Sequence, residues 1–397
     1  MRILFAAPNL PYPRISGGAQ RTAALLEALL GLGDVDCCFL PASLKDSNNY
    51  TIENATIKAI TPTDEIRISG AGKIGSYLPR QLQAFLLAER HRWRPYKPLI
   101  NKLGDLSRYD LIVARYLSTA CILDLFRHPK LMIDVDDYDP DRLKLRIANG
   151  GILKNLTLRH ALKHSLRAHK SILPHAAHCW VSNYHDKKNS GLNHATILPN
   201  IPHLKDNQLP TAIAPPPDSK IILMVGTFSY SANVNGAEAF IRYAWPQILV
   251  QHPDAELHLI GGGLPKKTQL KWQRNPGLKV RGFVKDLSLA YQQSSITVSP
   301  ILAGAGTNIK VLESAAYTRT PVVSKVALRG FEAHFTNNKS CIAADTIAQM
   351  AAGCIELLSN NELNQYIARN ANQVIQDHYT RKKFDIAVQE AIEKVLK

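Results

Sequence analysis

Short apolar runs alternate with amphipathic stretches throughout the second half of the chain. The runs have the length of buried strands and are SKIILMVGTF (219–228), AELHLIGGG (255–263), LKVRGFV (278–284), SITVSPI (295–301) and PVVS (321–324). Between them apolar residues recur at helical spacing, most clearly from Ala237 to Val250. Strands that alternate with helices of about 10 to 15 residues predict a parallel sheet covered by helices on both faces. The pattern therefore predicts a doubly wound α/β domain.

The first half repeats this order with longer loops. Strands are expected in RILFAAP, VDCCFL, TIKAI, DLIVARY, KLMIDVDD, HCWVSN and TILPN, and a helix in GGAQRTAALLEALLGLG. The stretch LPTAIAPPPDSK is rich in proline and has no periodicity, which indicates an interdomain linker. We therefore predict two doubly wound, Rossmann-like α/β domains facing a central cleft. Their expected bounds are 1–205 for the first, 206–218 for the linker, 219–378 for the second, and 379–397 for a C-terminal helix that could pack back on the first.

Composition places the chain among globular proteins. Its 397 residues exceed what one hydrophobic core usually holds, and 45% of them are hydrophobic. No apolar run reaches the roughly 18 residues of a membrane-spanning helix, and MRILFAAPNLPYPR is more typical of a first strand than of a signal peptide. The six cysteines show neither CxxC nor regular spacing, which predicts reduced thiols and a cytoplasmic location.

The net charge of +16 favours anionic partners. Neither zinc-finger spacing nor an RNA-binding signature accompanies it, so nucleic acid is not expected as a partner. Basic residues mixed with leucines fill 141–170, and the stretch 90–98 adds Trp93 and Tyr96 among arginines. Such stretches are typical either of surface helices that pack their leucines inward or of segments that lie on an anionic membrane. The second interpretation predicts peripheral contact with the inner face of a membrane and a lipid-linked acceptor.

A glycine-rich turn directly after a predicted strand is the strongest chemical signal. The turn Gly-Ala-Gly-Thr at 304–307 precedes a helix that carries Lys310 and Glu313. Helix N-termini hold unpaired N–H groups and a partial positive charge, and glycines let a phosphate approach the main chain. The pattern predicts either an anion site, to which Lys310 adds charge, or a tight turn with an exposed lysine. Since a carboxylate repels phosphate, Glu313 is expected either to accept hydrogen bonds from sugar hydroxyls or to be a helix-surface acid.

Six segments of the second half, in their order and spacing, resemble the nucleotide-sugar domain of GT-B-type retaining glycosyltransferases. This is the group 1, family 4-like class that builds bacterial polysaccharides. The segments within about 219–335 are Gly226, NVNGAEAF with WP, HPDAELHLIGGG, VRGFVKDL, SPILAGAGTNIKVLESAA and PVVS. In the first half, PNLPYPRISGGAQR resembles the family's proline and Gly-Gly turn after strand one, and ILPNIP resembles its segment before the linker.

The resemblance implies a role for each matching position. Glu313 matches the acid that binds the nucleotide ribose, and Lys310 would offset phosphate charge. The other implied donor-binding residues are Gly304, Ala305, Gly306 and Thr307 at the diphosphate or donor sugar, Gly282, Phe283 and Val284 at the base, Gly17 and Gly18 beside the diphosphate, and Gly226 and Asn233 after the first strand of the second domain.

Three departures from the family pattern concern charge and backbone. Ala305 stands where the family often has a first acid, and Arg319 lies in the segment where a glycine usually precedes PVVS. The family's cation pair after the first strand of this domain is missing from GTFSYSANVNG. Phosphate charge is therefore expected to be met by Lys310, Arg281 or Arg329.

A run of aspartates, DVDDYD at 134–139, follows the predicted strand KLMID. Asp136 and Asp137 occupy the places where the family often has His followed by Asp. Asp136 could orient an acceptor hydroxyl or stabilise positive charge on the sugar, and with Lys310 and Glu313 it completes the candidate catalytic set. The run could instead bind a divalent metal or cap the helix that begins near PDRLKLR.

Taken with the resemblance, these features imply a retaining transferase with a nucleotide diphosphate-sugar donor and a glycan or lipid-linked acceptor. The pathway expected is envelope polysaccharide or lipopolysaccharide synthesis. Because the leaving phosphate can take the acceptor's proton, no strong protein base is needed, and neither a metal nor another cofactor is expected. The alternative is a non-catalytic nucleotide- or sugar-binding protein on the same scaffold, which would bind the donor without turning it over.

Overall fold

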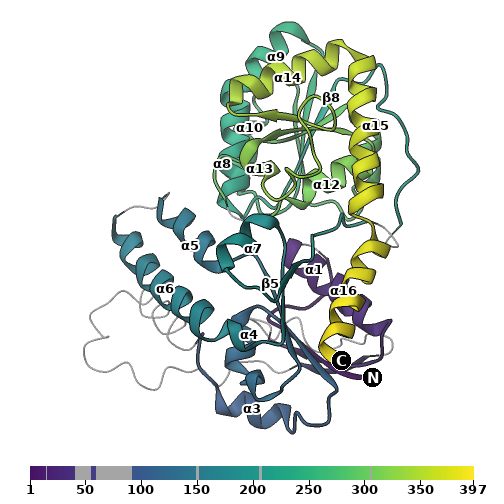
Figure 1. Cartoon of the computed structure of the whole chain (residues 1–397). Coiled ribbons are helices and arrows are strands. Elements are labelled where there is room, and N and C mark those ends of the chain that lie inside the picture. The colour runs from purple at the N-terminus through teal and green to yellow at the C-terminus, as the bar shows by residue number, and fades with distance from the viewer. Residues whose placement is uncertain (15, 41–54, 60–91, 149–151, 205–207, 305) are drawn as a thin grey trace. The chain divides into compact units, whose positions relative to one another are not determined.

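The chain forms two compact units in the computed structural model (Figure 1). The model describes residues 1–397 with the exception of 15, 41–54, 60–91, 149–151, 205–207 and 305. Unit 1 contains Met1–Pro199 and Phe384–Lys397, and unit 2 contains Asn200–Lys383.

Unit 1 is built on a parallel sheet. Within the described residues its elements are β1 (Arg2–Ala7), α1 (Gly17–Leu30), β2 (Asp34–Phe39), β3 (Ala55–Ala59), α3 (Lys97–Leu103), β4 (Leu111–Arg115), α4 (Leu117–Ile122), β5 (Leu131–Asp136), α5 (Asp139–Ala148), α6 (Ile152–Ser171), β6 (His178–Val181), α7 (Tyr184–Ser190) and β7 (Ala195–Ile197). The seven strands described lie in the order β3-β2-β1-β4-β5-β6-β7, and all pairs are parallel. Strand order reverses between β1 and β4, which is where open sheets of this kind place their ligands.

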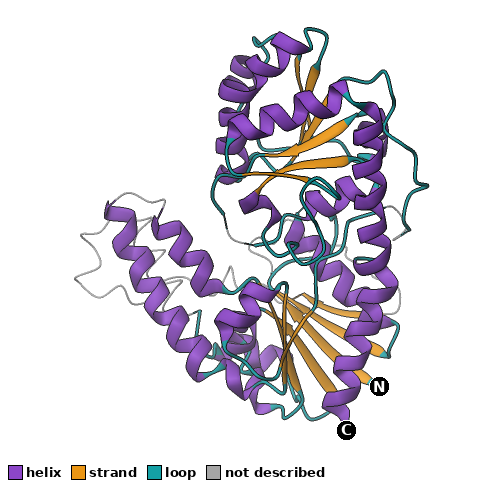
Figure 2. Cartoon of the chain, turned by 45° about the horizontal axis from the view of Figure 1, so that its top comes forward, coloured by secondary structure: helices purple, strands orange, loops and turns teal. Residues whose placement is uncertain are grey.

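Unit 2 repeats the plan with six described strands. Its elements are β8 (Ile221–Val225), α8 (Ser231–Ala239), α9 (Trp245–Gln251), β9 (Glu256–Ile260), α10 (Lys266–Trp272), β10 (Leu278–Gly282), α11 (Ser288–Gln293), β11 (Ile296–Ser299), α12 (Ile309–Ala316), β12 (Thr320–Ser324), α13 (Lys325–Leu328), β13 (Ile342–Ala344), α14 (Ile347–Ser359) and α15 (Asn361–His378). The order is β10-β9-β8-β11-β12-β13, again parallel, with the reversal between β8 and β11. In each unit helices cover both faces of the sheet (Figure 2). The predicted class of two doubly wound parallel α/β domains is confirmed.

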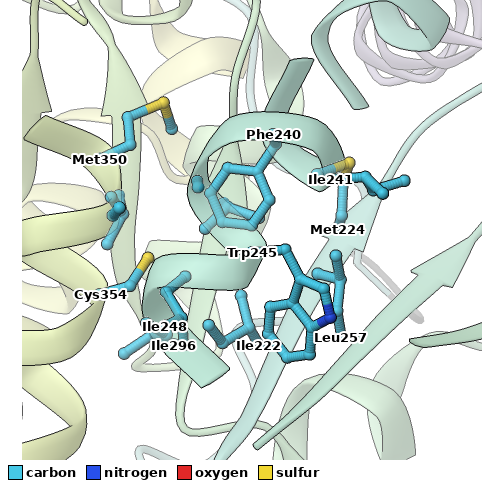
Figure 3. Close-up of a cluster of buried hydrophobic side chains, with 14 of the residues drawn as sticks. Ile222, Met224, Phe240, Ile241, Trp245, Ile248, Leu257, Ile296, Met350 and Cys354 are labelled. Carbon is cyan, nitrogen blue, oxygen red and sulfur yellow. The ribbon is translucent and has the colours of Figure 1, made fainter. Parts of the chain in front are cut away.

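One helix of unit 2 contains an irregularity that the sequence pattern does not show. The apolar spacing from Ala237 to Val250 predicts one continuous helix, and in the structure α8, a π-helical segment Phe240–Ala244 and α9 follow one another without a gap. Pro246 lies in the first turn of α9, which directly follows the π-helical segment, and a proline inside a helix lacks the N–H that would continue the α-helical hydrogen bonds. Both Phe240 and Trp245 are directed into the cluster of apolar side chains over the sheet (Figure 3).

The unit boundaries differ from the expected ones. Of the stretch expected as a linker, 206–218, the described residues 208–218 belong to unit 2: Leu209 packs against the core of that unit, and Pro215 is buried. At the other end of the chain, α16 (Arg381–Leu396) belongs to unit 1 from Phe384 onward. There Lys130 Nζ donates a hydrogen bond of 3.1 Å to the carbonyl of Leu396.

Helices α5 and α6 pack against each other and extend outward from the sheet of unit 1 (Figure 1). Their small shared core contains Leu143, Leu158 and Ala161. Crossing a membrane would require a longer or more apolar helix than any in the described part of the chain.

Candidate functional site

Gly226, Asn233 and Lys310 meet where β8 ends, and we call these three residues the lysine cluster. Lys310 Nζ donates a hydrogen bond of 2.6 Å to Asn233 Oδ1. The amide nitrogen of Asn233 donates at 2.9 Å to the carbonyl of Thr227, which fixes the orientation of the side chain. A Cβ on Gly226 would lie 3.1 Å from Asn233 Nδ2 and 3.4 Å from Lys310 Nζ. Glycine at this position therefore lets the ammonium group lie directly beside the main chain.

Glycines in neighbouring loops allow strand ends to approach closely. Gly261, just after β9, has φ of +152°, and a Cβ there would lie 1.7 Å from the carbonyl oxygen of Gly226. Gly236 in α8 likewise lies close to Pro300, whose carbonyl oxygen would be 2.1 Å from a Cβ at position 236. Only glycine fits either place. The loops after β8, β9 and β11 are thereby held together at one edge of the sheet.

Glu313 lies one turn after Lys310 on α12 and is buried. The hydroxyl of Tyr291 donates to Glu313 Oε2 at 3.3 Å. Burial raises the pKa of Glu313 to about 7, against the opposing effects of Tyr291, Lys310 and a main-chain hydrogen bond from His203. Burial also lowers the pKa of Lys310 to about 8, opposed by the charge of Glu313. Glu313 is therefore not the helix-surface acid of the alternative interpretation, and Lys310 is not an exposed lysine.

The turn before α12 is partly described. Gly306 has φ of +92°, which favours glycine, and Thr307 Oγ1 accepts a hydrogen bond of 2.6 Å from Asn200 Nδ2. Gly304 lies near Tyr230, since a Cβ on it would be 3.7 Å from that hydroxyl. Ala305, predicted as a donor contact, lies outside the described residues.

The residues predicted to meet the base lie at the end of β10. Gly282 has φ of +63°, and its carbonyl accepts from the N–H of Gly261 at 2.7 Å. Phe283 is 63% exposed, whereas Val284 packs partly against the core. Arg281 is exposed and shares a strand face with Lys279 rather than joining the lysine cluster. Burial first, and then the charge of Arg281, lower the pKa of His258.

Gly17 and Gly18, the remaining predicted donor contacts, begin α1 in unit 1. Ser16 caps this helix, its hydroxyl accepting from the N–H of Ala19 at 3.3 Å. The carbonyl of Gly18 accepts a hydrogen bond of 2.8 Å from Arg115 Nη1. A Cβ on Gly18 would meet nothing within 4 Å, so packing does not require glycine there.

Arg21, Arg115, Asp134 and Asp136 form a buried arginine–aspartate network at the carboxyl end of the sheet of unit 1. Arg21 binds Asp134 at 2.6 Å and approaches Asp136 at 3.5 Å. Arg115 lies 3.0 Å from Asp134 and 2.6 Å from Asp136. Although burial opposes the charged form, the two carboxylates hold the pKa of Arg21 above its usual value. Asp136, a predicted catalytic residue, thus has both carboxylate oxygens close to guanidinium groups.

Asp137 differs from its neighbours in the aspartate run. Asp139 and Asp141 lie in the first turn of α5 and are paired with basic residues, as the helix-cap interpretation predicts for that end of the run. In the described residues Asp137 has no ion pair, and its Oδ1 accepts a long hydrogen bond of 3.4 Å from Ser182 Oγ. Burial, then the charges of Asp136 and Asp186, raise the pKa of Asp137 to about 7. Among described residues, no group of three His, Cys, Asp or Glu side chains is placed to hold a metal ion.

Several of these residues escape sequence reasoning. Tyr291 contacts an acid 22 positions away, and arginines within helices or strands, such as Arg21 and Arg115, ordinarily indicate solvent-facing positions. Nothing local identifies them. Asn200 is different, because it lies in the segment ILPNIP, whose resemblance to the family marks it.

Comparison with known proteins identifies the fold and one domain of the chain. Residues 219–360 match the family model described as glycosyl transferases group 1. Sucrose-phosphate synthase from Thermosynechococcus elongatus is 14% identical over 99% of this chain and 98% of its own, with a TM-score of 0.71. A trehalose-6-phosphate structure from E. coli, bound with UDP-2-fluoro glucose, is 13% identical over 99% of each chain, with a TM-score of 0.69. HepE from Anabaena in complex with UDP is 12% identical over 99% and 100%, with a TM-score of 0.62.

No curated protein sequence matches the chain. The structural similarity, at these low identities, concerns the fold. The family model covers unit 2 from β8 through α14, including Lys310 and Glu313. Residues 219–360 are therefore a group 1 glycosyltransferase domain, carried by a chain with the GT-B fold.

Proposed function

We propose that the protein transfers a sugar from a nucleoside diphosphate-sugar to a glycan or lipid-linked acceptor, with retention of configuration. Unit 2 binds the donor and unit 1 binds the acceptor, and the pathway is envelope polysaccharide or lipopolysaccharide synthesis. The observation that supports this most is the arrangement on α12. Its buried acid, Glu313, lies one turn from an ammonium group held at a glycine-lined strand end.

Each group has a task in this proposal. The Lys310 ammonium and the main chain at Gly304 and Gly306 stabilise the diphosphate as negative charge develops on it. Glu313 accepts hydrogen bonds from the ribose hydroxyls, and Phe283 offers an exposed ring to the base. The charge of the leaving diphosphate is met by these groups, so the proposal requires no metal.

Donor turnover tests the proposal. The purified full chain is incubated with UDP-, GDP-, ADP- and CDP-sugars, and release of the nucleoside diphosphate is measured. Release from one donor supports transferase chemistry, with water as a slow acceptor. Tight binding of a nucleoside diphosphate without any release, also in the presence of added glycan acceptors, would favour a non-catalytic binding protein.

Asp137 is the better acceptor-side candidate in unit 1. Asp136 is neutralised by two arginines, whereas Asp137 lies half-buried at the carboxyl end of β5 without an ion pair in the described residues. Its carboxylate is thus available to a hydroxyl group. In the proposal Asp137 orients the attacking hydroxyl, and Asp136 keeps the arginines in place.

Asp137→Asn should lower the turnover number for donor cleavage about 100-fold, the size typical of misplacing a reacting group by about 1 Å. The affinity for the nucleoside diphosphate, which unit 2 binds, should change less than about twofold. Asp124→Asn, which removes a carboxylate paired with exposed Arg127, is the matched control in the same unit. Equal turnover in Asp137→Asn and the control would remove Asp137 from the reaction.

An anionic membrane surface is the second partner in the proposal, and α6 supplies the contact. Its exposed residues between 156 and 170 are Leu156, Arg159, His160, Lys163, Leu166, Arg167 and Lys170. Their spacing puts them on one helix face, and 152–171 contains no acidic residue. Of the stretch 90–98, the described residues 92–98 contribute less than expected, because Arg92 pairs with Asp139 and both Trp93 and Tyr96 pack against the core.

Vesicle sedimentation measures this contact. The wild type should bind phosphatidylcholine vesicles that contain phosphatidylglycerol, and should bind pure phosphatidylcholine weakly. Lys163→Gln with Arg167→Gln should weaken binding about 30-fold, because each basic residue near an anionic surface contributes about 1 kcal/mol. Lys266→Gln with Lys267→Gln removes the same charge from unit 2 as a control. Equal losses in both pairs would mean that net charge, and not α6, drives binding.

A further inference from the structure

Arg319 is a fully buried arginine that binds only main-chain carbonyl groups in the described part of the chain. Its guanidinium donates to the carbonyl oxygens of Tyr291 (2.6 Å), Gln292 (2.8 Å), Ile213 (2.8 Å), Thr318 (2.9 Å) and Tyr317 (3.1 Å). No carboxylate offsets its burial, which lowers the pKa of Arg319 to about 10. A buried cation without a counter-ion is costly. The five hydrogen bonds therefore must hold an arrangement of main-chain segments that a smaller or uncharged side chain cannot hold.

The five carbonyls belong to three separate segments of unit 2. Tyr291 and Gln292 are in the last turn of α11, Tyr317 and Thr318 follow the last residue of α12, and Ile213 lies in the proline-rich stretch before β8. Two of these places are helix C-termini, where carbonyls lack helical partners and the helix dipole favours a cation. The planar fork of the guanidinium reaches all three segments at once, which a lysine ammonium cannot do.

Both helix ends fixed by Arg319 carry tyrosines that lie beside Glu313. The rings of Tyr291 and Tyr317 are stacked, with centroids 4.7 Å apart and planes 5° from parallel. The hydroxyl of Tyr291 donates to Glu313, and the hydroxyl of Tyr317 is 2.9 Å from Ser288 Oγ on α11. A change in the spacing of α11 and α12 would therefore move the hydrogen-bond partner of Glu313.

We propose that Arg319 is a positioning residue that sets the place of Glu313 for nucleotide binding, acting through the stacked pair Tyr291 and Tyr317. This inference rests on the proposed function, in which Glu313 binds the ribose. It assigns a function to Arg319, which in the sequence is only a departure from the family's usual glycine before PVVS.

A double-mutant cycle separates positioning from general stability. The affinity of the nucleoside diphosphate that binds best is measured by calorimetry for the wild type, Arg319→Lys, Glu313→Gln and the double variant. Arg319→Lys should weaken binding about fivefold in the wild-type background and less than about twofold when Glu313 is already replaced, because residues that act through one another are not additive. Tyr291→Phe, which keeps the ring and loses the hydroxyl, should show the same dependence on Glu313.

Folding of each variant is checked by its unfolding transition without ligand, and Arg319→Gln replaces Arg319→Lys in the cycle if the lysine variant does not fold. Equal factors in both backgrounds, or no loss in the wild-type background, would overturn the inference. If Glu313→Gln weakens binding but the cycle is additive, only the role of Arg319 is wrong. If the wild type binds no nucleoside diphosphate, the proposed function itself fails.

Discussion

Lys310→Met should lower the turnover number for donor cleavage by about 100- to 1,000-fold, the loss seen when one preorganised donor to a developing negative charge is removed. The ammonium group is held at 2.6 Å by Asn233 and lies beside Gly226. The family's usual cation pair is missing here, so Lys310 carries the phosphate-facing charge in our account. Methionine has a similar length without the charge, so packing around α12 is retained.

The pH dependence of binding gives an independent check on Lys310. Burial lowers the pKa of this lysine to about 8, so the ammonium loses its proton as the pH rises through 8. Wild-type affinity for the nucleoside diphosphate should therefore fall above about pH 8, and Lys310→Met should bind weakly throughout without that additional fall. Lys325→Met, which removes an exposed lysine paired with Asp345, should behave as the wild type. Turnover and affinity within threefold of wild type in Lys310→Met would exclude the lysine from the site.

Arg115→Met should destabilise unit 1 by about 3–5 kcal/mol, because breaking a buried ion pair leaves uncompensated charge inside the protein. Arg115 is completely buried, and its guanidinium contacts Asp134, Asp136 and the carbonyl of Gly18. Its loss removes one of the two guanidinium groups that face both carboxylates. Denaturant unfolding of wild type and variant measures the difference, and Arg127→Met, at an exposed ion pair, should cost no more than about 1 kcal/mol.

Acidification distinguishes this explanation from simple loss of packing. In Arg115→Met two buried carboxylates lose one of their guanidinium partners. The loss destabilises the folded state most where both carboxylates are charged, and less where protons from solution offset their charge. The difference in the free energy of unfolding between wild type and variant, which we call the stability gap, should become smaller from pH 7 to pH 5. A gap that stays constant, or that is below about 1 kcal/mol at pH 7, would contradict the charge-based account.

The sequence predicts those parts of the fold whose signals are local. Short apolar runs locate β8 to β12, since a buried parallel strand needs only a short apolar segment. The glycine at 226 and the glycine-rich turn before α12 can also be recognised, because each comes just after such an apolar run. The apolar spacing from Ala237 to Val250 makes that helix visible in the sequence, but the pattern does not show that its Phe240–Ala244 segment is π-helical.

The remaining features depend on contacts between distant residues. The charges of Asp136 and Asp137 look equivalent in the sequence, and only the positions of Arg21 and Arg115 distinguish a neutralised carboxylate from an available one. Arg319 has no local signal either, because its partners lie in three separate segments. Patterns of hydrophobicity report which side of an element is buried, but not which polar groups pair across elements.

Binding of nucleotides to the wild-type chain tests the central claim most directly. UDP, GDP, ADP and CDP are titrated by calorimetry at pH 7.5, followed by the monophosphate of whichever base binds best. The account predicts saturable binding of one diphosphate and at least about tenfold weaker binding of its monophosphate, because a charge-assisted hydrogen bond to the second phosphate contributes about 1.5–3 kcal/mol. Failure of all four diphosphates to bind, or equal affinity for the monophosphate, would contradict a diphosphate site at Lys310 and the glycine-lined edge of unit 2.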